Sequence, residues 1–128
     1  MRTLLVADDN RLSRELVRDV LASADCRVVE AANGQEVIDR LEAAGPDLVL
    51  LDLEMPVKDG FAALAEIRHH PRFSNIPVMA LTAKAMLLDR DRIRTAGFDA
   101  YVSKPIDIAK LRECVDELLR SSRKGERL

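Results

Sequence analysis

The chain has 128 residues, and its 20 Lys and Arg residues nearly balance its 22 Asp and Glu residues, for a formal net charge of −2. This length fits one domain with a core of its own. The balanced charge indicates neither a nucleic-acid partner nor an anionic membrane surface. No uninterrupted apolar stretch reaches the roughly 18 residues that span a bilayer.

The cysteines and the N-terminal segment indicate the compartment. Cys26 and Cys114 are far apart in the sequence and belong to no metal-spaced cluster. The N-terminal segment MRTLLVADDN meets two acids, unlike the apolar core of a signal peptide. We therefore expect a reduced, cytoplasmic protein.

Short apolar runs alternate with amphipathic segments along the whole chain. Strands are predicted at residues 3–7, 27–31, 48–52, 77–82 and 99–102. Helices are predicted to begin near Leu12, Asn33, Asp59, Ala85 and Ile108. Asn33 and Glu36 are spaced as in a capping box, and Gly97 is a natural end for the fourth helix. Strands that alternate with helices at short spacing predict right-handed crossovers and a parallel sheet covered on both faces.

The third predicted strand is strongly apolar and ends in an acid. Residues 48–51 and Leu53 are apolar on either side of Asp52, as in a strand that is buried on both faces. A carboxylate is costly to bury, so Asp52 should lie at the rim of the sheet, before a loop that contains Pro56 and Gly60. The alternative is that Asp52 only caps the next helix or pairs with a lysine.

Polar residues stand at the carboxyl ends of several predicted strands. These ends meet at one edge of a parallel sheet, where such folds bind ligands. The residues are Asp8, Asp9, Asp52, Thr82 and Lys104. Three clustered carboxylates repel one another unless a divalent cation offsets their charge, and oxygen ligands in an open shell suit Mg²⁺.

Lys104 and Thr82 connect this predicted site to phosphate chemistry. A lysine supplies a point charge for one phosphoryl oxygen, and a hydroxyl can donate a hydrogen bond to another. Because carboxylates form aspartyl-phosphates in covalent catalysis, the pattern predicts phosphoryl transfer to Asp52 with help from a metal and the lysine. Asp8 and Asp9 could instead be caps of the first helix.

Five motifs together make the sequence resemble a known family. They are VADDN, LLDLEMPVKDGF, ALTAKAM, AGFDAY and SKPI, and at these intervals they resemble the receiver domain of two-component response regulators across residues 2–120. The resemblance implies an α/β fold, a doubly wound five-stranded parallel sheet of flavodoxin-like strand order 2-1-3-4-5 with five helices. We expect the receiver domain to occupy residues 1–121, and a polar, disordered C-terminal tail to occupy residues 122–128.

The resemblance also implies roles for the site residues. Asp52 would be the phosphoacceptor, and Thr82 and Lys104 would contact the phosphoryl group. The implied Mg²⁺ ligands are Asp8, Asp9, Asp52 and the backbone carbonyl of Glu54.

A conformational switch is implied as well. Thr82 would be its hydroxyl and Tyr101 its aromatic ring, although a lone tyrosine at a strand end is by itself typical of packing. The peptide bond between Lys104 and Pro105 is expected to be cis, because the resemblance implies it and a sharp turn would aim the lysine over the sheet edge.

These features predict a phosphorylatable signalling switch that catalyses only its own phosphorylation and dephosphorylation. A histidine kinase or a histidine phosphotransfer protein would donate the phosphoryl group, and a downstream protein would read the changed surface. We expect no nucleic-acid or membrane partner, and either a monomer or a phosphorylation-dependent dimer.

Two other classes of function share part of this pattern. A Mg²⁺-dependent small-molecule phosphohydrolase would also use an aspartyl-phosphate, and Glu54 stands where its general acid would be, two residues beyond Asp52. Such an enzyme needs a cap that excludes water, and no insertion here is long enough to form one. A receiver-like binding module without phosphorylation would lack one of the five site positions, and none is missing.

The fourth predicted helix suggests where the signal leaves. Ala85 or Met86, then Ile93 and Ala96, can fill an inward stripe. Leu87 and Leu88 are neighbours about 100° apart on the helix, so one of them, Leu87, should face solvent.

We expect Leu87 and Tyr101 to form a partner surface, although a single exposed leucine is also ordinary. Near the phosphoacceptor, Glu54 and Lys84 could pair and shield Asp52 from water, which would lengthen the phosphoryl lifetime slightly.

Overall fold

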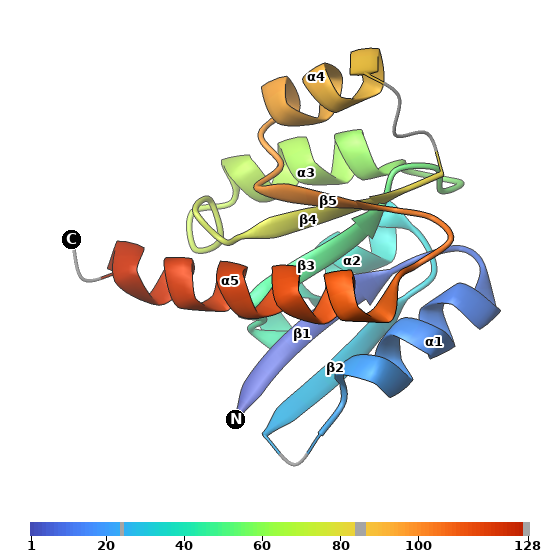
Figure 1. Cartoon of the computed structure of the whole chain (residues 1–128). Coiled ribbons are helices and arrows are strands. Elements are labelled where there is room, and N and C mark those ends of the chain that lie inside the picture. The colour runs from blue at the N-terminus through green and yellow to red at the C-terminus, as the bar shows by residue number, and fades with distance from the viewer. Residues whose placement is uncertain (24, 84–86, 127–128) are drawn as a thin grey trace.

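Five parallel strands form one sheet, and helices cover both of its faces (Figure 1). The computed structural model describes residues 1–23, 25–83 and 87–126, with the backbone alone at 87–88 and 121–126. The strands are β1 (Arg2–Ala7), β2 (Cys26–Ala31), β3 (Leu48–Asp52), β4 (Val78–Thr82) and β5 (Ala100–Ser103). The described helices are α1 (Arg11–Leu21), α2 (Gly34–Ala44), α3 (Gly60–His69), α4 (Leu87–Ala96) and α5 (Ile108–Glu126). The strand order β2-β1-β3-β4-β5 confirms the predicted doubly wound fold.

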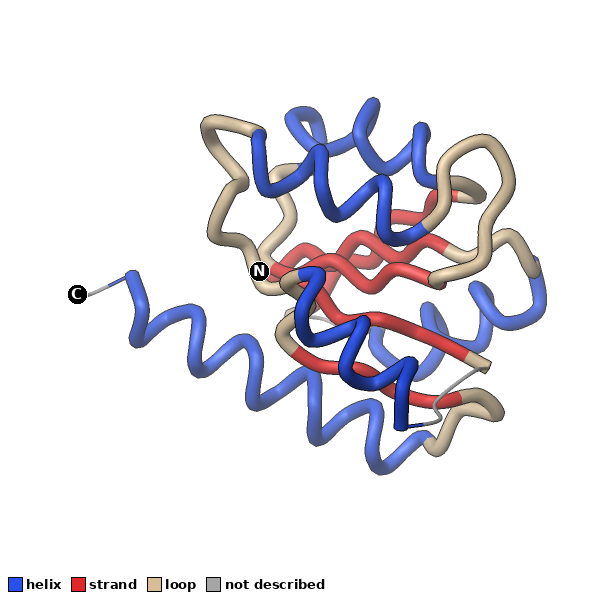
Figure 2. Tube along the Cα trace, turned by 90° about the horizontal axis from the view of Figure 1, so that it is seen from above, coloured by secondary structure: helices blue, strands red, loops and turns tan. Residues whose placement is uncertain are grey.

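The sheet separates two hydrophobic cores, because successive residues of a strand point to opposite faces. On one face, Leu5, Val49 and Ala80 pack with side chains of α2, α3 and α4. On the other face, Val6 and Leu50 pack with α1 and α5. Figure 2 shows the strands between these layers of helices. Every residue of β3 and β4 is buried, as expected for the central strands of a doubly covered parallel sheet.

Side-chain caps begin the first three helices. Asn10, Asn33 and Asp59 each accept a hydrogen bond from the backbone N–H three residues further on. Such a bond satisfies one of the N–H groups that the first turn leaves free. Because Asn10 caps α1, the alternative that Asp8 and Asp9 serve only as its caps is wrong.

Helix α4 is anchored by Ile93, which is 2% exposed. Ala96, which we expected on the same inward stripe, is exposed, so that part of the prediction is wrong. The reason is that α4 ends there and the chain turns at Gly97, whose φ is 109°. Phe98 then enters the core in place of Ala96.

Several predictions about the start of α4 fall on residues 84–88. Lys84, Ala85 and Met86 lie outside the described residues, and so do the side chains of Leu87 and Leu88. The inward position of Met86, the exposure of Leu87 and the pairing of Lys84 therefore remain predictions.

The C-terminal helix α5 reaches Glu126. Helical backbone thus continues into segment 122–128, which we expected to be a disordered tail. The division into residues 1–121 and a tail remains a prediction. No helix within the described part of the chain is long and apolar enough to cross a membrane.

Candidate functional site

The buried polar side chains of the described residues lie at the carboxyl-terminal edge of the sheet. Asp8 follows β1, Asp52 is the last residue of β3, and Thr82 is the last residue of β4. They are 0%, 5% and 2% exposed, respectively. Since parallel strands end at the same edge, residues far apart in the sequence meet here as predicted.

Lys104 reaches back over this edge from the loop after β5. Its Nζ donates to Asp8 Oδ2 at 2.9 Å and lies 3.3 Å from Asp52 Oδ2. Its backbone N–H donates to the Thr82 carbonyl at 2.7 Å, which fixes the loop to the end of β4. The peptide bond to Pro105 is cis, which confirms that prediction.

The surroundings of the Asp52 carboxylate disfavour its charged form. Its pKa is raised from 3.8 to about 6. Burial is the largest cause, and the charge of Asp8 also raises the pKa, whereas the Glu54 N–H and Lys104 lower it. Burial also acts to lower the pKa of the Lys104 ammonium, but Asp8 and then Asp52 raise it above its usual value. Lys104 lies closer to Asp8, so one ammonium offsets the charge of Asp52 only in part.

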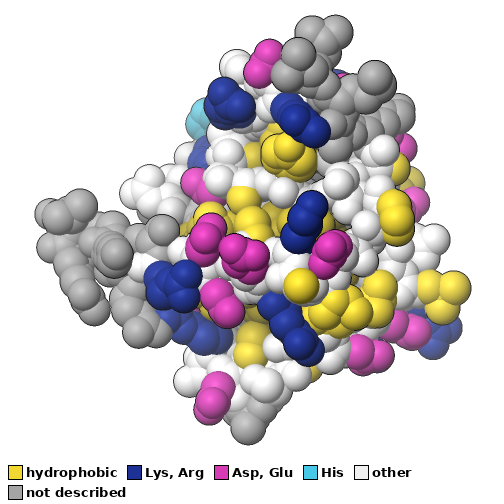
Figure 3. Space-filling view, in the orientation of Figure 1, with side chains coloured by type: hydrophobic (Ala, Val, Ile, Leu, Met, Phe, Trp, Pro, Cys, Tyr) yellow, Lys and Arg dark blue, Asp and Glu magenta, His cyan; other side chains and the backbone are white. Residues whose placement is uncertain are grey.

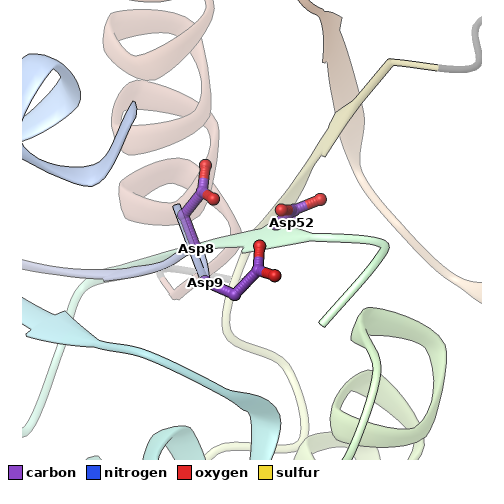
Figure 4. Close-up of side chains that lie close together, drawn as sticks. All are labelled: Asp8, Asp9 and Asp52. Atoms are coloured by element: carbon purple, nitrogen blue, oxygen red, sulfur yellow. The ribbon is translucent and has the colours of Figure 1, made fainter. Parts of the chain in front are cut away.

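Three carboxylates are placed to bind a cation. Oxygens of Asp8, Asp9 and Asp52 lie within 4.8 Å of one another (Figure 4). Asp9 is exposed, whereas the other two are buried, so the group opens to solvent on one side. An oxygen-only, partly open ligand set fits Mg²⁺, which keeps several of its waters. The residues present therefore fit the predicted metal.

The loop between β3 and α3 carries the fourth predicted ligand. The Glu54 N–H donates to Asp52 Oδ1 at 3.1 Å, which orients the carboxylate. The loop passes so close to the strand that a Cβ on Gly60 would lie 2.6 Å from the Asp52 carbonyl oxygen. Only glycine fits there. The use of the Glu54 carbonyl as a metal ligand remains a prediction.

Thr82 and Tyr101 project from the same face of the sheet. Tyr101 pairs with Ala80 in the register of β4 and β5, two residues before Thr82. Residues two apart on a strand share a face, so the hydroxyl of Thr82 and the ring of Tyr101 are diagonal neighbours. Tyr101 is half-buried against the core that α4 covers. This placement is compatible with the predicted switch, whose operation remains a prediction.

Two arginines near the site were not predicted. Arg14 Nη1 donates to the Asp8 backbone carbonyl at 2.8 Å. The guanidinium of Arg90 lies 5.8 Å from the centroid of the Tyr101 ring. Both side chains lie on helix surfaces where arginine is ordinary, so the sequence carries no signal for either contact.

Three comparisons with known proteins agree with this geometry. A family model described as the response regulator receiver domain matches residues 4–116. Among curated relatives, the polar-differentiation response regulator DivK of Brucella anthropi is 32% identical over 118 residues, which cover 92% of this chain and 96% of that protein. DivK of Brucella ovis is 31% identical over the same length.

Solved structures show the same likeness. A putative response regulator from Chloroflexus aurantiacus has a TM-score of 0.87 at 29% identity, and the match covers 93% of this chain and 98% of that one. The receiver domain of the sensor histidine kinase PA1611 from Pseudomonas aeruginosa, with a magnesium ion coordinated in its active-site cleft, has a TM-score of 0.84 at 30% identity. That match covers 92% of this chain and 97% of the other. The chain belongs to the response regulator receiver domain family of two-component signalling.

Proposed function

We propose that this chain is a phosphorylatable switch in which Asp52 accepts a phosphoryl group. The observation that carries the proposal is the buried Asp52 carboxylate, with the Lys104 ammonium 3.3 Å away and two further acids within 4.8 Å. The family match over residues 4–116 favours this function over the small-molecule phosphohydrolase.

The proposed chemistry is transfer from a phosphohistidine of a protein donor. An Asp52 oxygen attacks phosphorus, the bond between phosphorus and the histidine nitrogen breaks, and the released imidazole takes a proton from solvent. Lys104 stabilises the negative charge of the phosphoryl oxygens, and Thr82 donates a hydrogen bond to one of them. Mg²⁺ held by Asp8, Asp9, Asp52 and the Glu54 carbonyl would offset the remaining negative charge.

The donor must reach Asp52 across the surface at this edge of the sheet. Helices α1 and α5 both begin near the site, and they expose large apolar side chains there. Leu12 is 76% exposed, Leu16 42% and Ile108 43%. Figure 3 shows hydrophobic side chains gathered over α1 and the first part of α5. These side chains suit the apolar face of a histidine kinase or a histidine phosphotransfer protein.

The output of the switch is a change of surface that a downstream protein recognises. Thr82 moves toward the phosphoryl group, Tyr101 follows into the space that it leaves, and the face formed by Tyr101 and Leu87 changes shape. The protein acts in the cytoplasm, without a nucleic-acid or membrane partner, as a monomer or a phosphorylation-dependent dimer. It catalyses only its own phosphorylation and dephosphorylation.

Incubation with acetyl phosphate, with Mg²⁺ or with EDTA, tests the proposal. Intact mass should rise by one phosphoryl group in the wild type only when Mg²⁺ is present, and Asp52→Asn should gain none. Full phosphorylation of Asp52→Asn would place the acceptor elsewhere. Sustained release of inorganic phosphate from several small phosphate esters would instead support the hydrolase.

A further inference from the structure

Arg14 connects helix α1 to the acidic end of β1. Besides the hydrogen bond from Nη1 to the Asp8 carbonyl at 2.8 Å, its Nε donates to Glu30 Oε1 at 3.0 Å. The Arg14 side chain is 17% exposed. A guanidinium that bonds two acceptors in its plane is held in one orientation.

Glu30 is itself fixed from several directions. Arg18 Nη1 donates to its second carboxylate oxygen at 2.9 Å. Its backbone carbonyl accepts from Arg40 of α2, whose guanidinium also pairs with Glu36 at 2.9 Å. Arg14 is therefore supported by a network that runs around the β2 edge, from α1 to α2. Because Arg40 holds the Glu30 backbone independently of Arg18, Glu30 keeps a support when Arg18 is replaced.

The backbone that Arg14 holds carries both acids of the pair. The Asp8 side chain has its own bonds, to Lys104 and to the Asn10 N–H. For the Asp9 carboxylate the described residues provide no hydrogen-bond partner. Its position within 4.8 Å of the other two acids therefore depends on the backbone of residues 8 and 9. The Asp8 N–H donates to the Ala31 carbonyl of β2 at 3.1 Å, which holds the start of this segment. Beyond that bond, Arg14 is the described side chain that binds the segment from outside the loop, through the Asp8 carbonyl.

We propose that Arg14 is a positioning residue for the metal site: by holding the Asp8 carbonyl, it keeps the carboxylates of Asp8 and Asp9 converged on Asp52. The inference rests on the Mg²⁺ site of the proposed function. Three carboxylates without a cation repel one another, so a loop that is held only weakly would relax and separate them. Restraining the loop in advance lowers the free-energy cost of gathering the ligands.

The structure supplies a matched control for this role. Arg18 shares the same Glu30 partner but makes no contact with Asp8. Replacing Arg18 therefore removes a comparable ion pair and leaves the carbonyl contact in place. Arg14→Lys keeps the positive charge but loses the planar pair of donors that reaches both acceptors.

The test is Mg²⁺ titration of the wild type, Arg14→Ala, Arg14→Lys and Arg18→Ala by calorimetry, with amide NMR spectra of the metal-free forms. Loss of a residue that orients metal ligands typically costs about ten- to a hundredfold in affinity. Arg14→Ala should weaken Mg²⁺ binding about tenfold or more, Arg14→Lys should recover only part of it, and Arg18→Ala should stay within about twofold. In the metal-free spectra, the Asp9 and Asn10 amides should shift in Arg14→Ala and not in Arg18→Ala.

The outcomes separate this inference from the function on which it rests. If the wild type binds Mg²⁺ and both alanine variants lose affinity equally, Arg14 contributes only general stability and the positioning role is overturned. Unchanged affinity in Arg14→Ala overturns it as well. If the wild type binds no Mg²⁺, the metal part of the proposed function fails and the role of Arg14 fails with it. Thermal unfolding of each variant identifies the temperature at which all are folded and can be compared.

Discussion

At the scale of the residue, the surroundings of Asp52 disfavour the charged form of its side chain. This carboxylate is buried, lies beside Asp8 and shares one lysine with it. Its pKa is raised to about 6, so the folded protein binds this proton more tightly than the unfolded chain does. The stabilising effect of the proton is complete below about pH 4 and is lost as the pH rises through about 6.

Asp52→Asn should therefore be more stable than the metal-free wild type at neutral pH. One pKa unit corresponds to about 1.4 kcal/mol, so we expect a gain of about 1 to 3 kcal/mol in the free energy of unfolding at pH 7.5. The gain should become small near pH 3.5, where Asp52 is mostly protonated in both states. Urea unfolding in EDTA at the two pH values measures it. An equal gain at both values would mean that the charge of Asp52 is not its cause.

Val57, in the loop between β3 and α3, has a strained backbone conformation. Its φ is 67°, a left-handed conformation that β-branched side chains rarely adopt, and its side chain is 81% exposed, so no packing compensates the strain. Val57→Asn should raise the free energy of unfolding by about 1 kcal/mol, because asparagine tolerates this region. Val57→Ala, which keeps a Cβ, should gain less. Chemical denaturation measures the free energy of unfolding of the three proteins. An equal gain for the alanine and asparagine variants would contradict this explanation.

At the scale of the element, the described side chains of α4, residues 89–96, bury little apolar surface. Ile93 is the buried side chain of its described part, and arginines on either side of it lie over aromatic rings. Arg90 lies 5.8 Å from the Tyr101 ring, and Arg92 lies 4.1 Å from the Phe61 ring. Such contacts contribute about 0.5 to 1 kcal/mol at exposed sites. The two cation–π contacts are therefore weak enough for one substitution to change the position of a ring.

Arg90 should bias the position of Tyr101, the aromatic ring of the proposed switch. The chain has one tyrosine and no tryptophan, so ultraviolet emission reports on Tyr101 alone. Loss of about 0.5 to 1 kcal/mol in Arg90→Gln should change the ratio of ring positions about two- to fivefold. Tyrosine fluorescence and the NMR shifts of the ring protons should follow that change. Arg94→Gln, on the same helix but without a ring contact in the described structure, should leave both signals unchanged.

At the scale of the whole molecule, the carboxyl-terminal and amino-terminal ends of the strands differ in their side-chain contacts. The carboxyl-terminal edge gathers like charges, whereas the opposite edge is tied together by Arg68 of α3. Its guanidinium donates to the carbonyls of Ser74, Ile76 and Gly97 and to the Asp99 carboxylate. Asp99 in turn accepts from the Val78 N–H at the start of β4. One side chain thus joins the end of α3 to the starts of β4 and β5.

Arg68→Ala should lower the free energy of unfolding by about 2 kcal/mol, because several acceptors lose a charged donor while remaining partly shielded from water. Arg72→Ala is the control, since the described contact of that exposed side chain is a 5.0 Å approach to the Phe73 ring. It should cost less than about 1 kcal/mol. Phosphorylation of Asp52 by acetyl phosphate should proceed in both variants at temperatures where they are folded. If folded Arg68→Ala were not phosphorylated, that result would contradict this expectation. It would mean that the Arg68 contacts at the amino-terminal ends of the strands affect the chemistry at their carboxyl-terminal ends.

Much of this molecule follows from local patterns. The strands and helices were predictable in type and order because apolar periodicity and capping residues such as Asn33 and Asp59 are encoded within a few positions. The meeting of Asp8, Asp52, Thr82 and Lys104 was predictable as well. It needs only the rule that parallel strands end at one edge, and no knowledge of side-chain geometry.

The sequence by itself thus determined the order of the elements and the chemistry of the site edge, whereas the contacts that support that edge were decided by the tertiary structure alone. Arg14 and Arg68 bind backbone carbonyls, and a carbonyl is present at every residue, so residue type does not mark the one that is bound. Ala96 was placed wrongly because helix periodicity gives a residue's face and not whether the sheet still lies beneath that face at the last turn of α4. Long-range geometry of this kind depends on how helices pack on the sheet, which no short pattern in the chain encodes.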